Sequence, residues 1–233
     1  MWQAIREELH PHGLEVVTVA LDLRGTETAG KYLKRARSAH PALVDQGHRL
    51  GALLGVVNVP SGVWIDEEGV IVRPPETAFP EGSVNAQPPE TFGPIPESLD
   101  PYLRDALLET RKIRIDAAAY TAALRDWARH GPASRFALSP QEVVARSQPR
   151  PLETSRAAAH FELGQHLHRA GHPDAAIEHF REAHRLQPDN WTYKREAWSM
   201  VRRDQGPSDV YEGDWLSDVR RVGAENYYPA ADL

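Results

Sequence analysis

The sequence predicts an α/β unit followed by an all-α module, and three observations support this fold class. Over the first 75 residues, short runs rich in β-branched residues alternate with stretches of helical periodicity. Eight prolines between Pro74 and Pro101 then interrupt both helix and strand ladder. From residue 100 onward, helix caps replace the strand signals. We therefore divide the chain into five segments: 1–75 (α/β unit), 76–99 (proline-rich linker), 100–150 (helical segment), 151–206 (helical repeat and capping helix) and 207–233 (aromatic tail).

The α/β unit opens with a helix whose residues Ile5 and Leu9 share one face and which Gly13 ends. The last two strands are joined by a short turn ending in Gly69, which is typical of an antiparallel hairpin. We expect the strands to form one mixed sheet. The remaining elements follow from β-branched runs and helix breakers: strands over 14–22, 42–45, 62–66 and 70–73, and helices over 29–38 and 48–55.

Beyond the linker, three helix starts are marked by capping residues. Asp100 precedes Pro101, a favourable pair for a cap and a first helical position. Asp116 can cap a second helix that ends at Gly131. Ser139 with Glu142 forms the S-x-x-E capping box of a third, short helix.

Charge and hydropathy exclude several classes of function. The chain has 33 acidic and 27 basic residues, a formal net charge of -6, and no long block of either sign. This argues against nucleic-acid binding through bulk positive charge. No apolar run reaches the roughly eighteen residues of a membrane span, and the first residues form an amphipathic segment without the apolar stretch of a signal peptide. We expect no membrane association and a cytoplasmic location, unless a signal sequence precedes Met1.

Cysteine is absent from all 233 residues. Disulfides, thiolate metal sites and every mechanism that needs a protein thiol are therefore excluded for these residues.

Residues 54–72 read LGVVNVPSGVWIDEEGVIV, and this phrase carries a resemblance to a known family. It resembles the second half of a thioredoxin-like domain, most closely the TlpA/ResA group of the redoxin superfamily, in which a proline of this phrase is cis and faces the active site. The resemblance covers about residues 1–75. It implies that Pro60 is the cis-proline and that Val59 offers backbone groups to a bound peptide or thiol partner.

The catalytic loop of that family has no counterpart in this chain. In the family a cysteine or selenocysteine follows a first central strand, whereas Met1 to His10 resembles the later turns of the helix after that loop. Either the reactive residue lies upstream of Met1, which we favour, or the chain is a degenerate relative. A sheet without its central strand exposes unpaired strand edges, so we expect another strand or a second copy of the chain, as a homodimer, to cover them.

A second resemblance lies at residues 157–190. The spacing of Gly164, Gly171, Ala176, Phe180 and Pro188 resembles a 34-residue tetratricopeptide (TPR) repeat, with residues 191–203 as a capping helix. A single repeat cannot bury its own apolar face, so it should dock on the rest of the chain. By analogy with peptide-binding repeats, the first helix would present a set of partner-binding residues: Ala158, Phe161, Gln165, His168 and Arg169.

Six of the eleven histidines lie in this repeat, yet their spacing does not match a metal motif. We therefore predict solvated helix faces, no metal site and no cofactor.

Two classes of function remain open. The first is a thiol-disulfide oxidoreductase or peroxidase of the redoxin family whose reactive residue lies upstream, so that the chain as it stands is redox-inactive. The second is a non-catalytic module in which a degenerate redoxin scaffold and a repeat unit bind a protein or peptide partner.

Both classes predict that the purified 233-residue chain catalyses neither insulin reduction by dithiothreitol nor thiol-dependent peroxide reduction, because no residue supplies a thiolate. Initial rates compared with a protein-free control test this expectation. A rate above that control contradicts it.

Overall fold

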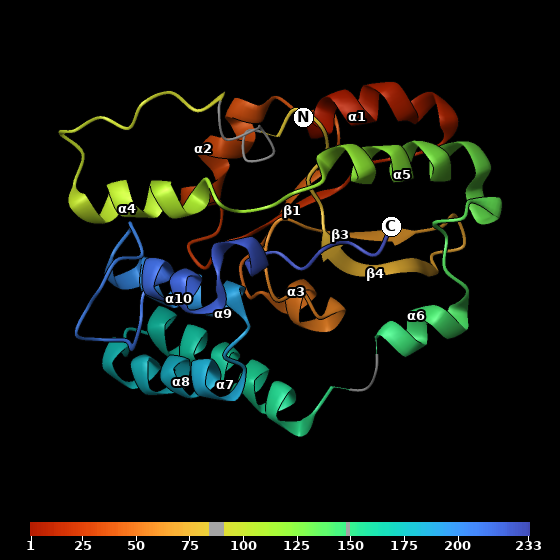
Figure 1. The fold of residues 1–233 in the computed structure, drawn as a ribbon. Helices are drawn as coiled ribbons and strands as arrows, with labels where there is room; N and C mark the ends of the chain where they lie inside the picture. Colours follow the sequence, from red (N-terminus) through yellow and green to blue (C-terminus); the bar gives the residue numbers. More distant parts are fainter. Residues whose placement is uncertain (84–90, 148–149) are drawn as a thin grey trace.

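A computed structural model describes residues 1–83, 91–147 and 150–233 of the chain. The first part of the chain contains both helices and strands (Figure 1). They are α1 (Trp2–Leu9), η1 (His10–His12), β1 (Thr18–Leu21), α2 (Thr26–Ala36), β2 (Ala42–Asp45), α3 (Arg49–Leu54), β3 (Ser61–Ile65) and β4 (Ile71–Thr77). The later elements are helical: α4 (Pro101–Thr110), α5 (Ala117–His130), η4 (Gly131–Ala133), α6 (Pro140–Arg146), α7 (Leu152–Arg169), α8 (Pro173–Leu186), α9 (Trp191–Val201), α10 (Trp215–Val222) and η5 (Ala224–Asn226).

The strands form two separate two-stranded sheets, so the prediction of one mixed sheet is wrong. β1 pairs in parallel with β2, with Thr18 opposite Ala42, and β3 pairs antiparallel with β4. The two pairs would form one sheet if a strand of one paired with a strand of the other, directly or through a further strand, and in the described residues neither occurs. The first strand is also shorter than expected, because Leu14 and Val16 turn into the core beside α1 instead of joining the ladder.

β4 continues beyond its predicted end through two consecutive prolines. Trp64 pairs with Arg73 and Gly62 pairs with Glu76, so Pro74 and Pro75 together lie opposite the single residue Val63. Two residues facing one make a β-bulge, where proline is tolerated because it has no ladder hydrogen bond to donate. The bulge explains why a proline pair ends the predicted strand but not the observed one.

Several local predictions are confirmed. The Val59–Pro60 bond is cis. Asp100 and Asp116 cap α4 and α5, and Ser139 and Glu142 form the expected capping box of α6. No helix in the described part of the chain is both long and apolar enough to cross a bilayer.

The α/β unit has its own core between the β3–β4 hairpin and helices α1 and α5. Ile5 and Leu9 of α1 pack there with Trp64 of β3 and with Tyr120 and Leu124 of α5. The Trp64 indole donates a hydrogen bond to the Tyr120 hydroxyl at 3.2 Å, and Trp127 stacks on the same indole. Figure 1 shows α1 and α5 lying side by side above the hairpin.

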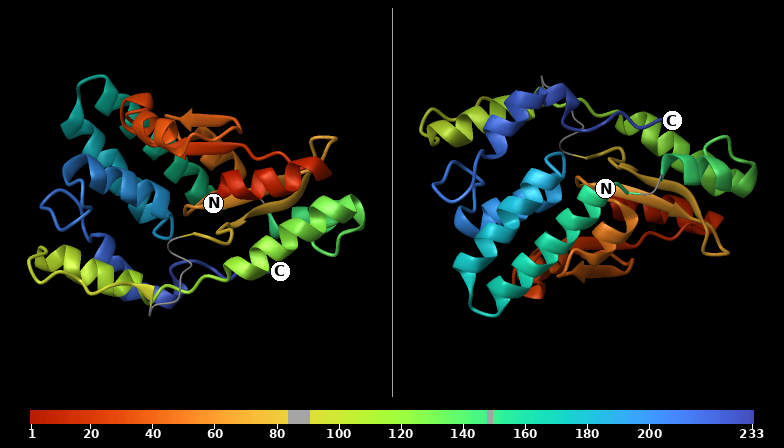
Figure 2. Two further views of the ribbon diagram at one scale, coloured as in Figure 1. Left: turned by 90° about the horizontal axis from the view of Figure 1, so that it is seen from above. Right: turned by 90° about the horizontal axis from the view of Figure 1, so that it is seen from below.

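A second core joins the repeat to the C-terminal region. It combines Phe161 and Phe180 of the α7–α8 pair with Tyr193 and Trp198 of α9, and Tyr227 of the tail also enters it. Both views in Figure 2 place α9 between the α/β unit and the α4–α10 pair. The aromatic tail therefore packs back on its own chain, as expected.

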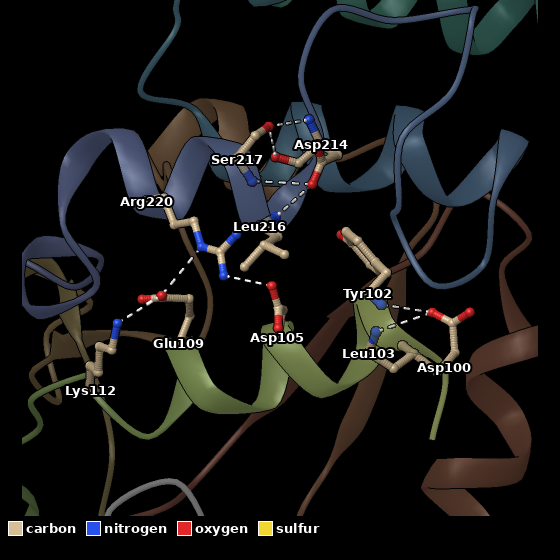
Figure 3. A network of polar contacts seen from close by, with 10 residues as sticks. All are labelled: Asp100, Tyr102, Leu103, Asp105, Glu109, Lys112, Asp214, Leu216, Ser217 and Arg220. Atoms are coloured by element: carbon tan, nitrogen blue, oxygen red, sulfur yellow. Dashed lines mark hydrogen bonds and ion pairs between the residues drawn. The ribbon is translucent and has the colours of Figure 1, made fainter. Parts of the chain in front are cut away.

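Helix α10 is attached to α4 by charged side chains (Figure 3). Arg220 reaches Asp105 at 2.8 Å and Glu109 at 3.3 Å, and Lys112 also contacts Glu109 at 2.7 Å. Hydrogen bonding to Lys112, and then to Arg220, lowers the pKa of Glu109. Asp214 accepts hydrogen bonds from the N–H groups of Leu216 and Ser217 and so caps α10.

The close approach of α7 and α8 yields a stability prediction. A Cβ atom at Gly164 would lie 2.8 Å from the Phe180 ring, so we expect Gly164→Ala to lower the free energy of unfolding by about 1–3 kcal/mol. Gly30→Ala is the matched control, since Gly30 is also helical and its added Cβ would meet nothing nearer than 3.9 Å. That variant should be neutral or more stable by up to about 1 kcal/mol. Urea unfolding followed by circular dichroism measures both, and equal effects contradict the packing argument.

Candidate functional site

The loop before β3 is held by the C-terminal tail. The Val59 N–H donates to the Asn58 side-chain oxygen at 2.9 Å, and the Val59 carbonyl accepts from the Tyr228 hydroxyl at 2.9 Å. The Asn58 amide nitrogen in turn donates to the Tyr227 carbonyl at 3.1 Å. Both backbone polar groups of Val59, which the redoxin resemblance assigns to a partner, are thus already hydrogen-bonded within the chain. Pro60 borders an open groove next to this loop.

The repeat residues named from the sequence do not share one open surface. Phe161 and Gln165 are buried, His168 is partly buried and Arg169 is exposed. Phe161 stacks on Tyr193 of α9, with ring centroids 4.1 Å apart, and its ring also meets that of His48 at 5.2 Å. Helix α9 and the α/β unit therefore cover the inner face of α7 that was expected to bind a partner.

A buried polar pair lies where the two units meet, at the carboxyl ends of β1 and β2. His48 is 3% exposed, and its Nε2 lies 3.9 Å from Oε2 of Glu196 on α9. The other carboxylate oxygen of Glu196 accepts the Leu23 N–H at 2.9 Å, just after β1 ends. Neither ring nitrogen of His48 has a hydrogen-bond partner among the described residues. The carboxyl ends of parallel strands are a common ligand position, and here α9 occupies it.

Burial sets the protonation of this pair. It lowers the pKa of His48 to about 4, against a smaller opposing effect of Asp45. It raises the pKa of Glu196 to about 7, with Asp22 adding to the rise, while the Leu23 N–H and Arg24 oppose it. At neutral pH the imidazole is therefore uncharged, and the contact with Glu196 is not an ion pair.

The histidines of the repeat include one close pair. Nδ1 of His160 on α7 lies 2.9 Å from Nδ1 of His179 on α8, within hydrogen-bond distance. In the part of the chain that the structure describes, no three histidine, aspartate or glutamate side chains gather as metal ligands would.

The open groove beside Pro60 has a volume of about 570 Å³, and we name it the docking groove. Its lining residues are 51–58, 60–61, 74–77, 146–147, 150, 154, 187, 190, 193 and 229–232. It thus lies between α3, β4, the end of α6, the start of α7 and the tail. Its volume is within the range of about 300–1,000 Å³ that is usual for ligand sites.

The large apolar side chains most exposed among the described residues lie on the three helices that border the docking groove. Leu53 at the end of α3 is 77% exposed, Leu152 at the start of α7 is 68% exposed, and Val144 on α6 is 65% exposed. Sequence reasoning missed these residues. The only signal was the run Leu50, Leu53 and Leu54 in a helix too short to bury all three.

Comparison with known proteins identifies one part of the chain. Residues 157–190 match the model of the tetratricopeptide repeat family, which confirms the repeat predicted from the sequence. No curated protein and no solved structure matches the chain. The redoxin resemblance of residues 1–75 stays a prediction.

We expect substitutions of the two residues of this buried pair to change the pH dependence of stability in opposite directions, relative to the wild type. The lowered pKa of His48 contributes stability that is lost as pH falls from 6.5 to about 4. The raised pKa of Glu196 contributes stability that is lost as pH rises from 4.5 to about 7. Between about pH 5 and pH 7, the free energy of unfolding should therefore rise more steeply than in the wild type for Glu196→Gln, and less steeply for His48→Gln.

Between these two pH values, the change in the free energy of unfolding of each variant should differ from that of the wild type by about 2 kcal/mol. One unit of pKa corresponds to about 1.4 kcal/mol. Urea unfolding followed by tryptophan fluorescence at both pH values measures it. Wild-type and variant profiles that run parallel would show that the pair does not titrate as its burial implies.

Proposed function

We propose that this chain is a non-catalytic protein-interaction module and that it binds partner segments in the docking groove. The observation that carries this proposal is the position of the most exposed apolar side chains, Leu53, Val144 and Leu152, on the helices around one open groove. Leu53 itself lines the groove, and an exposed apolar side chain at a concave surface is typical of docking sites.

The tetratricopeptide repeat supports an interaction function, since such repeats act by presenting binding surfaces. Its inner face is not the surface that we propose, because Phe161 and Gln165 are buried there. The start of α7 and residues Gln187 and Asn190, after α8, instead form part of the docking groove. The repeat thus contributes one wall of a site that it shares with α3 and β4.

A thiol-disulfide oxidoreductase is the other candidate, and the resemblance of residues 54–72 to a phrase of the redoxin family is the observation that favours it. The 233 residues contain no cysteine, so they cannot perform thiol chemistry themselves. In either case the docking groove beside Pro60 is where we expect a partner polypeptide to bind.

Selection of peptides on the full chain tests the proposed function. We expect a phage-displayed library of random twelve-residue peptides to yield binders whose affinity falls at least about tenfold on Leu53→Asp. Loss of one buried leucine contact of about 1.5–3 kcal/mol corresponds to a change of this size. Fluorescence anisotropy with the selected peptides measures the dissociation constants.

Leu108→Asp is the control for this experiment, since Leu108 is also exposed but lies on α4, away from the docking groove. Thermal unfolding confirms that both variants are folded. If no peptide is selected, or if both substitutions weaken binding equally, the docking groove is not the binding site.

A further inference from the structure

The charges of the docking groove indicate which peptides it accepts. Four charged residues line it: Glu76, Arg146, Arg150 and Asp232. The Glu76 carboxylate accepts two hydrogen bonds from the buried Arg73 guanidinium, from Nε at 2.6 Å and from Nη2 at 2.8 Å. Arg146 pairs with Asp232 at 2.8 Å. Among the described residues no carboxylate lies within salt-bridge distance of Arg150, so this side chain is the unpaired cation of the groove.

Arg150 is held next to the most exposed leucine. One guanidinium nitrogen, Nη2, donates a hydrogen bond to the Leu53 carbonyl at 2.7 Å. This contact places the cation at the C-terminal end of α3, where the helix dipole favours positive charge. An arginine has five N–H donors, so enough remain to bind a carboxylate with two parallel hydrogen bonds.

The tail provides an example of such binding within the chain. Pro229 accepts a hydrogen bond from Thr77 at 3.1 Å through its carbonyl, and the Asp232 carbonyl accepts one from Arg73 at 2.7 Å. The Asp232 carboxylate pairs with Arg146 at the end of α6. The groove wall thus already accommodates a short segment that combines small apolar residues with one carboxylate.

A second groove has a volume of about 650 Å³, and the described residues that line it include no arginine or lysine. It lies between the β3–β4 turn and α6, and most of its charged side chains are acidic and already bonded. Glu15 is paired with Arg6, Asp66 accepts N–H groups of its own turn, and Glu142 caps α6. We therefore place the charge-selective site in the docking groove.

We propose that the docking groove selects extended acidic peptides, with a ligand carboxylate on Arg150 and a neighbouring aliphatic side chain against Leu53. This inference rests on the proposed function and adds the chemical class of the partner. The apolar contact gives affinity, and the Arg150 guanidinium gives selectivity for aspartate or glutamate beside an aliphatic residue.

The same library tests the inference. Peptides selected on the wild-type chain should carry aspartate or glutamate next to an aliphatic residue. Replacing that acidic residue with asparagine or glutamine should weaken binding about tenfold, which is usual for loss of one charged hydrogen-bonded pair. Arg150→Gln should have a similar effect, and selection on Arg150→Glu should enrich lysine and arginine at the same peptide position.

Arg35→Glu is the control, since it makes the same change of charge as Arg150→Glu at an exposed position on α2. It should leave the affinities unchanged. Peptides that lose affinity on Leu53→Asp but carry no acidic residue and bind Arg150→Glu normally overturn the acidic preference while leaving the docking groove as a binding site. Peptides insensitive to Leu53→Asp overturn both proposals.

Discussion

Helix α9 is the element that holds the other parts of this chain in place. Its Thr192 N–H donates to the Val57 carbonyl at 3.2 Å, and its Glu196 carboxylate accepts a hydrogen bond from the Leu23 N–H. Two loops of the α/β unit are therefore hydrogen-bonded to α9. Tyr193 stacks on Phe161 of the repeat, and Trp191 meets Tyr227 of the tail. One eleven-residue helix therefore contacts the α/β unit, the repeat and the tail.

This dependence follows from two units that are each incomplete. Two-stranded sheets are marginally stable alone, and a single repeat has no neighbouring repeat on which to stack. Each unit needs an apolar surface from outside itself, and α9 with the aromatic tail supplies one. As a consequence, the inner face of the repeat is covered, and Phe161 and Gln165 are buried there and not accessible to a partner.

Local signals predicted the elements well, whereas long-range placement could not be predicted. Capping residues such as Asp100 and Ser139 act within a few residues of the chain, so their helices were predicted at the right positions. The separation of the two sheets, and the contact of Tyr228 with Val59 across 169 residues, depend on how distant segments pack. The docking groove was missed for the same reason, since its walls come from five separate parts of the chain.

The arrangement explains why binding should occur beside the repeat and not within it. Once α9 fills the inner face of α7, the remaining concave surface lies where α7 begins, next to α3 and β4. There the short helix α3 cannot bury Leu53, because a six-residue helix has too few turns to direct all its leucines inward. The hydrogen bond from Arg150 then fixes a cation beside that leucine. An exposed apolar side chain with an adjacent unpaired charge is thus a consequence of how the two incomplete units are joined.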